Sequence, residues 1–199
     1  LLAAYGGPGR TALGFPPSYS MHPLLALATA TGWVDAAPAD PTHPQYLAPP
    51  SVDRVVAAIT DHDPSIVILV SPNNPTGASI DPEVIEAACA TARGLVVVDE
   101  AYGEFTDAPS ALTLLHSYPR LLVTRTMSKA FGLAGARVGY LVGDPDLLSG
   151  VHLVRLPYHL STLNQVAAEA ALTHRALLLP AVADLRRERD RLVSGLRAL

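Results

Sequence analysis

The pattern that most constrains the fold of this chain is an alternation of short apolar runs with longer amphipathic segments. Three runs are nearly continuous in apolar residues, which is typical of strands covered on both faces: Ile66–Val70, Leu95–Val98 and Leu121–Thr124. Strands of this kind that alternate with helices predict an α/β domain, built on a mainly parallel sheet flanked by helices.

Weaker strands and several helices complete this pattern. Further strands are expected at Thr11–Phe15, Trp33–Ala37 and Val138–Val142. Helices are expected at Met21–Thr31, Ser51–Thr60, Pro82–Arg93, Pro145–Val154, Ser161 to about His174, and Pro180–Leu199. Asp81 before Pro82 indicates a helix start, and Ser51 or Asp53 is expected to begin another helix in the same way. The stretch Pro38–Pro50, with its five prolines, predicts a surface loop.

Composition excludes several classes of protein. Of the 199 residues 49% are hydrophobic, enough for a substantial core and too many for a disordered chain. A net charge of -4 argues against nucleic acid or an anionic membrane surface as the main partner, and the mixed-sign run at 186–191 is interpreted as a solvated helix face. No apolar stretch is long enough to span a bilayer. The single cysteine, Cys89, indicates a reducing compartment and is expected to pack in the core.

Polar segments follow the three strongest strands. They are SPNNPTG at 71–77, DEAY at 99–102 and TRTMSKAF at 124–131, with Arg137 a little further on. Because ligands bind outside the carboxyl ends of the strands in open α/β sheets, we expect these segments to share one site. Taken alone each is ambiguous, since NNPTG also suits a plain turn and Asp99 also suits a helix cap or a surface carboxylate.

Taken together and in this order, the segments resemble the fold-type I pyridoxal-phosphate aminotransferases. Within that superfamily SPNNPTG, VVVDEAYGEF and RTMSKAFGLAGARVGY are similar to the histidinol-phosphate aminotransferases, and PPSYSMHP and RLPYHLST fit the actinobacterial members of that family. The resemblance runs from about Thr11 to the end of the chain. Its motifs are highly specific for the cofactor and only moderately specific for the substrate.

The resemblance gives Lys129 the central role. A lysine amine that loses its proton can condense with the aldehyde of pyridoxal 5'-phosphate, whereas arginine stays protonated and cannot. Lys129 is the only lysine among the 14 basic residues, so it is the only candidate. The family implies that Lys129 forms an internal aldimine and moves a proton between substrate and cofactor. A general replacement of lysine by arginine would also explain the count.

Seven further residues match cofactor-binding positions of the family. Asp99 matches the carboxylate that pairs with the pyridine nitrogen. The family also implies a residue that stacks on the ring, two donors to the phenolic oxygen and a group of residues that binds the phosphate. These further positions fall on Tyr19 for stacking, Asn74 and Tyr102 for the phenolic oxygen, and Thr126, Ser128 and Arg137 for the phosphate. Simple packing is an alternative for Tyr19, and a strand end without function is one for Thr126.

The resemblance also implies an organisation and a reaction. We expect a cofactor-binding large domain at 1–178, incomplete at its N-terminus, and a helix at 179–199 that leads toward a small domain. The N-terminal arm and the C-terminal small domain are expected to be absent from this chain. The implied reaction moves an amino group between histidinol phosphate and 2-oxoglutarate or glutamate in histidine biosynthesis. The resemblance further implies that the protein is a cytoplasmic homodimer with no nucleic-acid or membrane partner.

The sequence shows no motif for a dinucleotide, P-loop or metal site, and several alternative functions stay open. The glycine clusters at 6–9 and 132–135 fit neither a Rossmann fingerprint nor a P-loop, and the seven histidines and one cysteine show no spacing that indicates a metal site. Tyr158 and His159 are expected either at the mouth of the active site or subunit interface, or packed between helices. The alternatives for function are an aromatic or other amino-acid aminotransferase, a phosphothreonine decarboxylase of the same fold, and a non-catalytic remnant.

Overall fold

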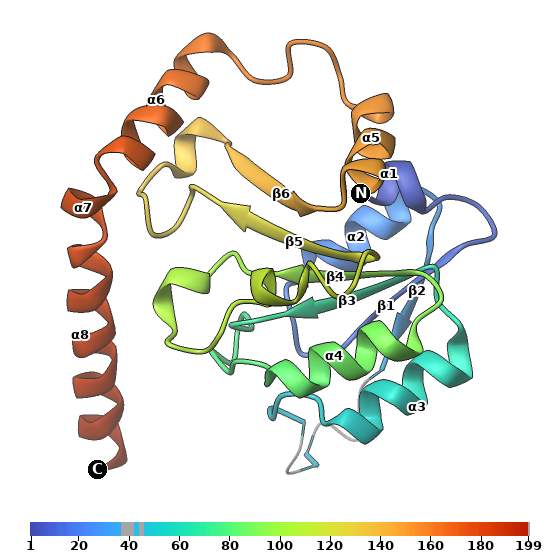
Figure 1. Cartoon of the computed structure of the whole chain (residues 1–199). Helices are drawn as coiled ribbons and strands as arrows, with labels where there is room; N and C mark the ends of the chain where they lie inside the picture. Colours follow the sequence, from blue (N-terminus) through green and yellow to red (C-terminus); the bar gives the residue numbers. More distant parts are fainter. Residues whose placement is uncertain (37–41, 44–45, 199) are drawn as a thin grey trace.

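A six-stranded sheet forms the centre of the computed structural model, which describes residues 1–36, 42–43 and 46–198. The sheet has the order β2-β1-β3-β4-β5-β6; the first five strands are parallel and β6 runs antiparallel to β5 (Figure 1). The strands are β1 (Thr11–Gly14), β2 (Gly32–Asp35), β3 (Ile66–Val70), β4 (Leu95–Asp99), β5 (Leu121–Thr126) and β6 (Gly139–Gly143). The mainly parallel sheet predicted from the sequence is confirmed.

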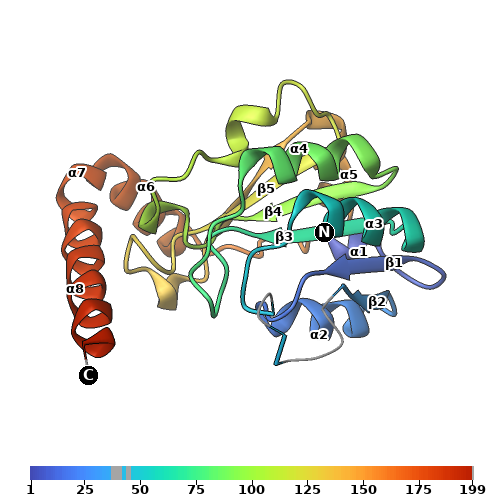
Figure 2. The same ribbon diagram turned by 90° about the horizontal axis from the view of Figure 1, so that it is seen from below.

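Helices cover both faces of this sheet, as Figures 1 and 2 show. On one face α3 (Val52–His62) and α4 (Pro82–Thr91) bury residues such as Ile59 and Ile85 against the sheet. On the other face α1 (Leu2–Tyr5) and α5 (Pro145–Val154) pack on a second apolar cluster. The Tyr5 hydroxyl donates to the carbonyl of Leu147 at 2.5 Å and so ties α1 to α5. Burial on both faces explains why β3, β4 and β5 are apolar throughout.

Helix ends follow local chemistry. The Ser51 hydroxyl accepts a hydrogen bond from the backbone N–H of Arg54 at 3.3 Å, so α3 is capped as predicted. Asp81 precedes α4 as expected but makes no side-chain cap bond. Helix α2 (Met21–Ala28) ends three residues earlier than predicted, because Ala30 adopts a positive φ of 54° and stops the helical path.

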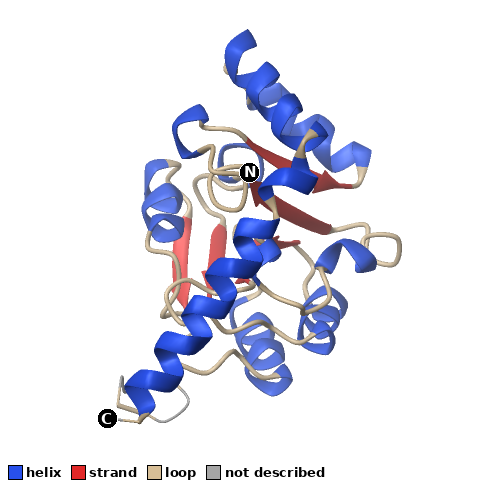
Figure 3. Cartoon of the chain, turned by 90° about the vertical axis from the view of Figure 1, so that its left-hand side faces the viewer, coloured by secondary structure: helices blue, strands red, loops and turns tan. Residues whose placement is uncertain are grey.

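The last three helices lie to one side of the sheet, and Figure 3 views the molecule from that side. They are α6 (Thr162–Thr173), the short α7 (Arg175–Leu178) and α8 (Pro180–Arg197). In α8 the apolar residue Val182 is buried, whereas Leu185, Leu192 and Leu196 are exposed. The charged run at 186–191 lies on the solvated part of the helix, with an ion pair between Arg191 and Glu188.

Several short elements had no clear sequence signal. They are α7 and the 3-10 helices η1 (Gly103–Phe105), η2 (Ala111–Leu114) and η3 (Ala134–Ala136). Two predictions fall partly outside the described residues. They are the surface loop at 38–50 and the last residue of the strand expected at Trp33–Ala37. Among the described helices no single one is long and apolar enough to cross a membrane; only the bent pair Thr162–Thr173 and Arg175–Arg197, at 72°, meets the length and composition criteria.

Candidate active site

The register of the sheet brings the three polar segments to one edge. Val70 at the end of β3 lies opposite Asp99 at the end of β4, and Asp99 lies opposite Thr124 on β5. Because the three strands are parallel, the segments that follow them emerge side by side at the carboxyl edge of the sheet. This is the edge at which open α/β sheets bind ligands.

A cavity of about 300 Å³ opens at this edge. The structure brings all eight predicted site residues to its walls, although they come from four separate stretches of the chain. The lining residues are Tyr19, Val70, Asn74, Asp99, Ala101, Tyr102, Thr124, Arg125, Thr126, Ser128, Lys129 and Arg137. Their shared location is an observation, whereas the role of each residue remains a prediction.

The Asp99 carboxylate is held from two sides. Its Oδ1 accepts a hydrogen bond from the backbone N–H of Ala101 at 3.0 Å, and its Oδ2 lies 3.2 Å from Nε2 of His22. The two side chains are only 17% and 13% exposed, so the contact is largely shielded from water. The rings of Tyr19 and His22 meet edge to face at a centroid distance of 5.4 Å. His22 therefore connects Tyr19 and Asp99, both of which line the cavity.

Sequence reasoning missed His22. Its only signal in the sequence was its position three residues after Tyr19, at the beginning of the predicted helix. Its partner Asp99 is 77 residues away along the chain, so the contact itself depends on the fold.

The Lys129 side chain stands over an aromatic ring. Its Nζ lies 5.3 Å from the ring centroid of Tyr102, which in turn packs against Phe105 at 6.1 Å. The neighbours Met127 and Phe131 are buried in a cluster with residues of α6 and α8. The backbone around Lys129 is therefore anchored, while its amine is exposed at the cavity.

Hydroxyl and guanidinium groups gather at another part of the wall. Thr126 Oγ1 donates to Ser128 Oγ at 2.9 Å and accepts from the Ser128 backbone N–H at 3.1 Å. Arg137 adopts a positive φ of 52°, uncommon for a residue with a side chain, and donates from Nη1 to the carbonyl of Ala134 at 3.0 Å. Hydroxyls beside a planar cation are suited to bind the oxygens of a phosphate.

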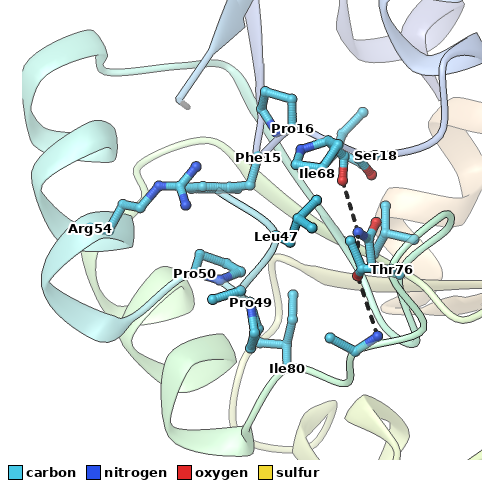
Figure 4. Close-up of a pocket in the computed structure, with 15 residues that line it drawn as sticks. Phe15, Pro16, Ser18, Leu47, Pro49, Pro50, Arg54, Ile68, Thr76 and Ile80 are labelled. Carbon is cyan, nitrogen blue, oxygen red and sulfur yellow. Dashed lines mark hydrogen bonds between the residues drawn. The ribbon is translucent and has the colours of Figure 1, made fainter. Parts of the chain in front are cut away.

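A second missed residue, Asn73, precedes Asn74 and lines a smaller, separate hollow. Its Nδ2 donates to the carbonyl of Pro17 at 2.8 Å and to Oγ1 of Thr76 at 3.0 Å. It thus joins the turn before Tyr19 to the turn that holds Asn74. Figure 4 shows the small hollow between these turns, which Leu47, Arg54 and Ile80 also line.

Other residues singled out from the sequence lie away from the cavity. Tyr158 is 99% exposed, so the predicted alternative of packing between helices is wrong for it; neither Tyr158 nor His159 lines the cavity. Cys89 is buried in α4, as predicted, and burial raises the pKa of its thiol to about 12. Among the described residues no group of three or more His, Cys, Asp or Glu side chains is placed to hold a metal ion.

Comparisons with known proteins agree with this geometry. The family model for aminotransferase class I and II matches residues 1–199. A curated histidinol-phosphate aminotransferase of Frankia casuarinae is 56% identical over 100% of this chain and 50% of its own length, and that of Thermobifida fusca is 53% identical over 100% of this chain and 53% of its own.

A solved histidinol-phosphate aminotransferase of Sinorhizobium meliloti, in complex with pyridoxal-5'-phosphate, superposes with a TM-score of 0.84 at 26% identity. The match covers 96% of this chain and 51% of that one. The chain thus spans about half the length of the relatives it matches. It belongs to the class I and II aminotransferase family.

Proposed function

We propose that the protein containing this chain binds pyridoxal 5'-phosphate and transfers an amino group between histidinol phosphate and 2-oxoglutarate. The observation that carries the proposal is the position of Lys129. The only lysine in 199 residues stands in the same cavity as a shielded carboxylate and a group of phosphate-type donors. The choice of substrate rests on curated relatives of that name at 49–56% identity over the chain.

The donor set fits the cofactor part by part. The Lys129 amine would hold the aldehyde carbon, and Asp99 would hold the protonated pyridine nitrogen. Thr126, Ser128 and Arg137 would hold the phosphate through their hydroxyl and guanidinium groups. When bound, the cofactor supplies an electron sink for the bonds at the substrate's amino-bearing carbon.

The protein's own groups would then position atoms and move protons. The Asp99 carboxylate, held by His22 and Ala101 at the sheet edge, would favour a proton on the group that it faces. When it is not bonded to the cofactor, the Lys129 amine would accept a proton from the substrate carbon and return it at a different carbon. Asn74 and Tyr102 would donate hydrogen bonds to the phenolic oxygen, and the half-exposed Tyr19 would cover a face of the ring.

We further propose the organisation that the resemblance implies. Residues 1–178 would form the cofactor-binding large domain, and 179–199 would lead toward a small domain. The active protein would be a cytoplasmic homodimer. Equilibrium sedimentation of the full-length protein tests the dimer.

Lysine substitution in the full-length protein tests the chemistry. Lys129→Ala removes the amine, and Lys129→Arg keeps the positive charge without an amine that can lose its proton. We expect both variants to lose turnover by at least about a thousandfold, because a group that forms a covalent bond and moves the proton is gone. Borohydride reduction followed by peptide mass spectrometry should find the cofactor on Lys129 in the parent. Normal turnover in Lys129→Ala would refute the proposed function.

The substrate needs its own measurement. Single-turnover spectra with histidinol phosphate, phenylalanine and threonine phosphate should show the largest and fastest change with histidinol phosphate. No change with histidinol phosphate would exclude the proposed substrate and leave the cofactor assignment standing. Titration of the 199-residue chain with pyridoxal 5'-phosphate tests whether this part binds the cofactor by itself.

A further inference from the structure

A largely buried ion-pair cluster adjoins the proposed cofactor site, and its central residue, Arg125, also lines the cavity. Arg125 on β5 donates from Nε and Nη2 to Oε2 of Glu100, at 3.0 and 2.6 Å, and from Nη1 to Oε1 of Glu104 at 3.3 Å. The Ser110 hydroxyl and the backbone N–H of Ala111 also donate to the Glu100 carboxylate. Glu100 is only 4% exposed, and hydrogen bonds from Arg125, Ser110 and Ala111 satisfy both oxygens of its buried carboxylate.

The cluster is built for close contact. A Cβ atom added at Gly103 would lie 3.2 Å from Arg125 Nη2 and 3.4 Å from Glu100 Cβ, so a larger residue there would crowd the pair. Burial lowers the pKa of the Arg125 guanidinium, but the hydrogen bond and charge of Glu100 and the charge of Glu104 outweigh it and raise the pKa overall. The guanidinium therefore stays charged, and its geometry stays fixed by its fork of donors.

The two carboxylate partners of Arg125 lie in the same segment as two of the proposed site residues. Glu100 follows Asp99, and Glu104 lies two residues after Tyr102. Arg125 itself precedes Thr126 and lies four residues before Lys129. The cluster thus clamps the segment that carries Asp99 and Tyr102 to the segment that carries the phosphate-type donors and the lysine.

We infer that Arg125 and Glu100 are positioning residues that set the distance between the two halves of the cofactor site. Lys129 Nζ stands 5.3 Å from the Tyr102 ring, and these two residues come from the two clamped segments. Loss of the clamp would move the amine relative to Tyr102 and Asp99. This inference rests on the proposed function, because it concerns the same site.

The experiment uses the full-length protein and three single variants. Arg125→Lys keeps the charge but loses the fork, Glu100→Gln keeps the shape but loses the charge, and Arg93→Gln breaks an exposed pair with Asp63 as a control. We expect the Kd for pyridoxal 5'-phosphate to rise at least tenfold in the first two variants and to stay within twofold in the control. The pH profile of the bound cofactor's visible band should shift in the first two variants only.

Three outcomes would overturn the inference. Unchanged Kd and pH profile in Arg125→Lys and Glu100→Gln, in a parent that binds the cofactor, would refute it and leave the proposed function intact. A parent that fails to bind would refute both. Should these variants not fold, Glu104→Gln, which loses only the 3.3 Å contact, is expected to raise Kd about threefold. An unchanged Kd in Glu104→Gln would then refute the inference.

Discussion

Substitution of Asn73 measures how strongly the turn before Tyr19 and the turn that holds Asn74 are joined. In Asn73→Ala the carbonyl of Pro17 and Oγ1 of Thr76 lose their bonds to Nδ2, while the backbone bonds of the turn remain. Each hydrogen bond contributes about 0.5–1.5 kcal/mol, which gives a cost of about 1–3 kcal/mol. The Oδ1 atom is buried without a partner among the described residues, so its removal offsets part of the loss. We expect a net loss of about 1–2 kcal/mol.

Urea unfolding and thermal unfolding of the full-length protein check this value. A loss of about 1–2 kcal/mol corresponds to a fall in Tm of about 2–8 °C for a domain of this size. Asn73→Asp should cost more than Asn73→Ala, because it places a carboxylate oxygen against the carbonyl of Pro17. Gln165→Ala, which loses one exposed bond to the carbonyl of Leu160, is the control and should stay within about 0.5 kcal/mol of the parent. Parent-like stability in Asn73→Asp would refute the reasoning.

Two further predictions concern Cys89 and His22. Since the unfolded thiol loses its proton near pH 9 and the folded thiol only near about 12, the parent loses stability relative to Cys89→Ala as pH rises above 9. The difference in free energy of unfolding between the parent and Cys89→Ala, measured by urea titration, should change by about 1 kcal/mol between pH 8.5 and 10. A difference that stays constant over this range would contradict the pKa shift. His22→Phe keeps the ring beside Tyr19 but removes the contact to Asp99, so cofactor affinity should fall about tenfold in absorbance titrations. Equal affinity in parent and variant would show that His22 does not support Asp99.

The sequence predicted the bounds of an element well where both faces of a strand are buried or where a clear helix-start signal is present. The strand at Ile66–Val70 has the same bounds in the structure because both of its faces are buried, so every position carries the apolar signal. The helix at Pro145–Val154 also has its predicted bounds, since Asp144 caps it and proline occupies the first turn. The end of α2 was missed because it depends on the positive φ of Ala30, for which alanine gives no signal.

The shared location of the candidate site residues was predictable from the sequence, but the contacts that support them were not. Strand ends and motif order placed Asp99, Tyr102 and Lys129 at one edge of the sheet. The contacts that support them join residues 77 positions apart, as in His22 and Asp99, or 25 apart, as in Glu100 and Arg125. Such pairs follow from the strand order β3-β4-β5 and the turn geometry, which a single sequence does not specify.

Residues next to the predicted site residues explain how this edge can be both polar and rigid. Each of these neighbours is hydrogen-bonded to another segment of the protein, and one of them, Arg125, lines the cavity as well. Asn73 anchors the turn of Asn74, Glu100 anchors the segment of Asp99, and Arg125 anchors that of Thr126. Each supporting residue is held by at least two hydrogen bonds, so a substitution there is expected to displace the adjacent site residue; Asn73 and Glu100 do not line the cavity themselves. Variants of the supporting residues should therefore weaken cofactor binding, whereas loss of Lys129 should remove the chemistry.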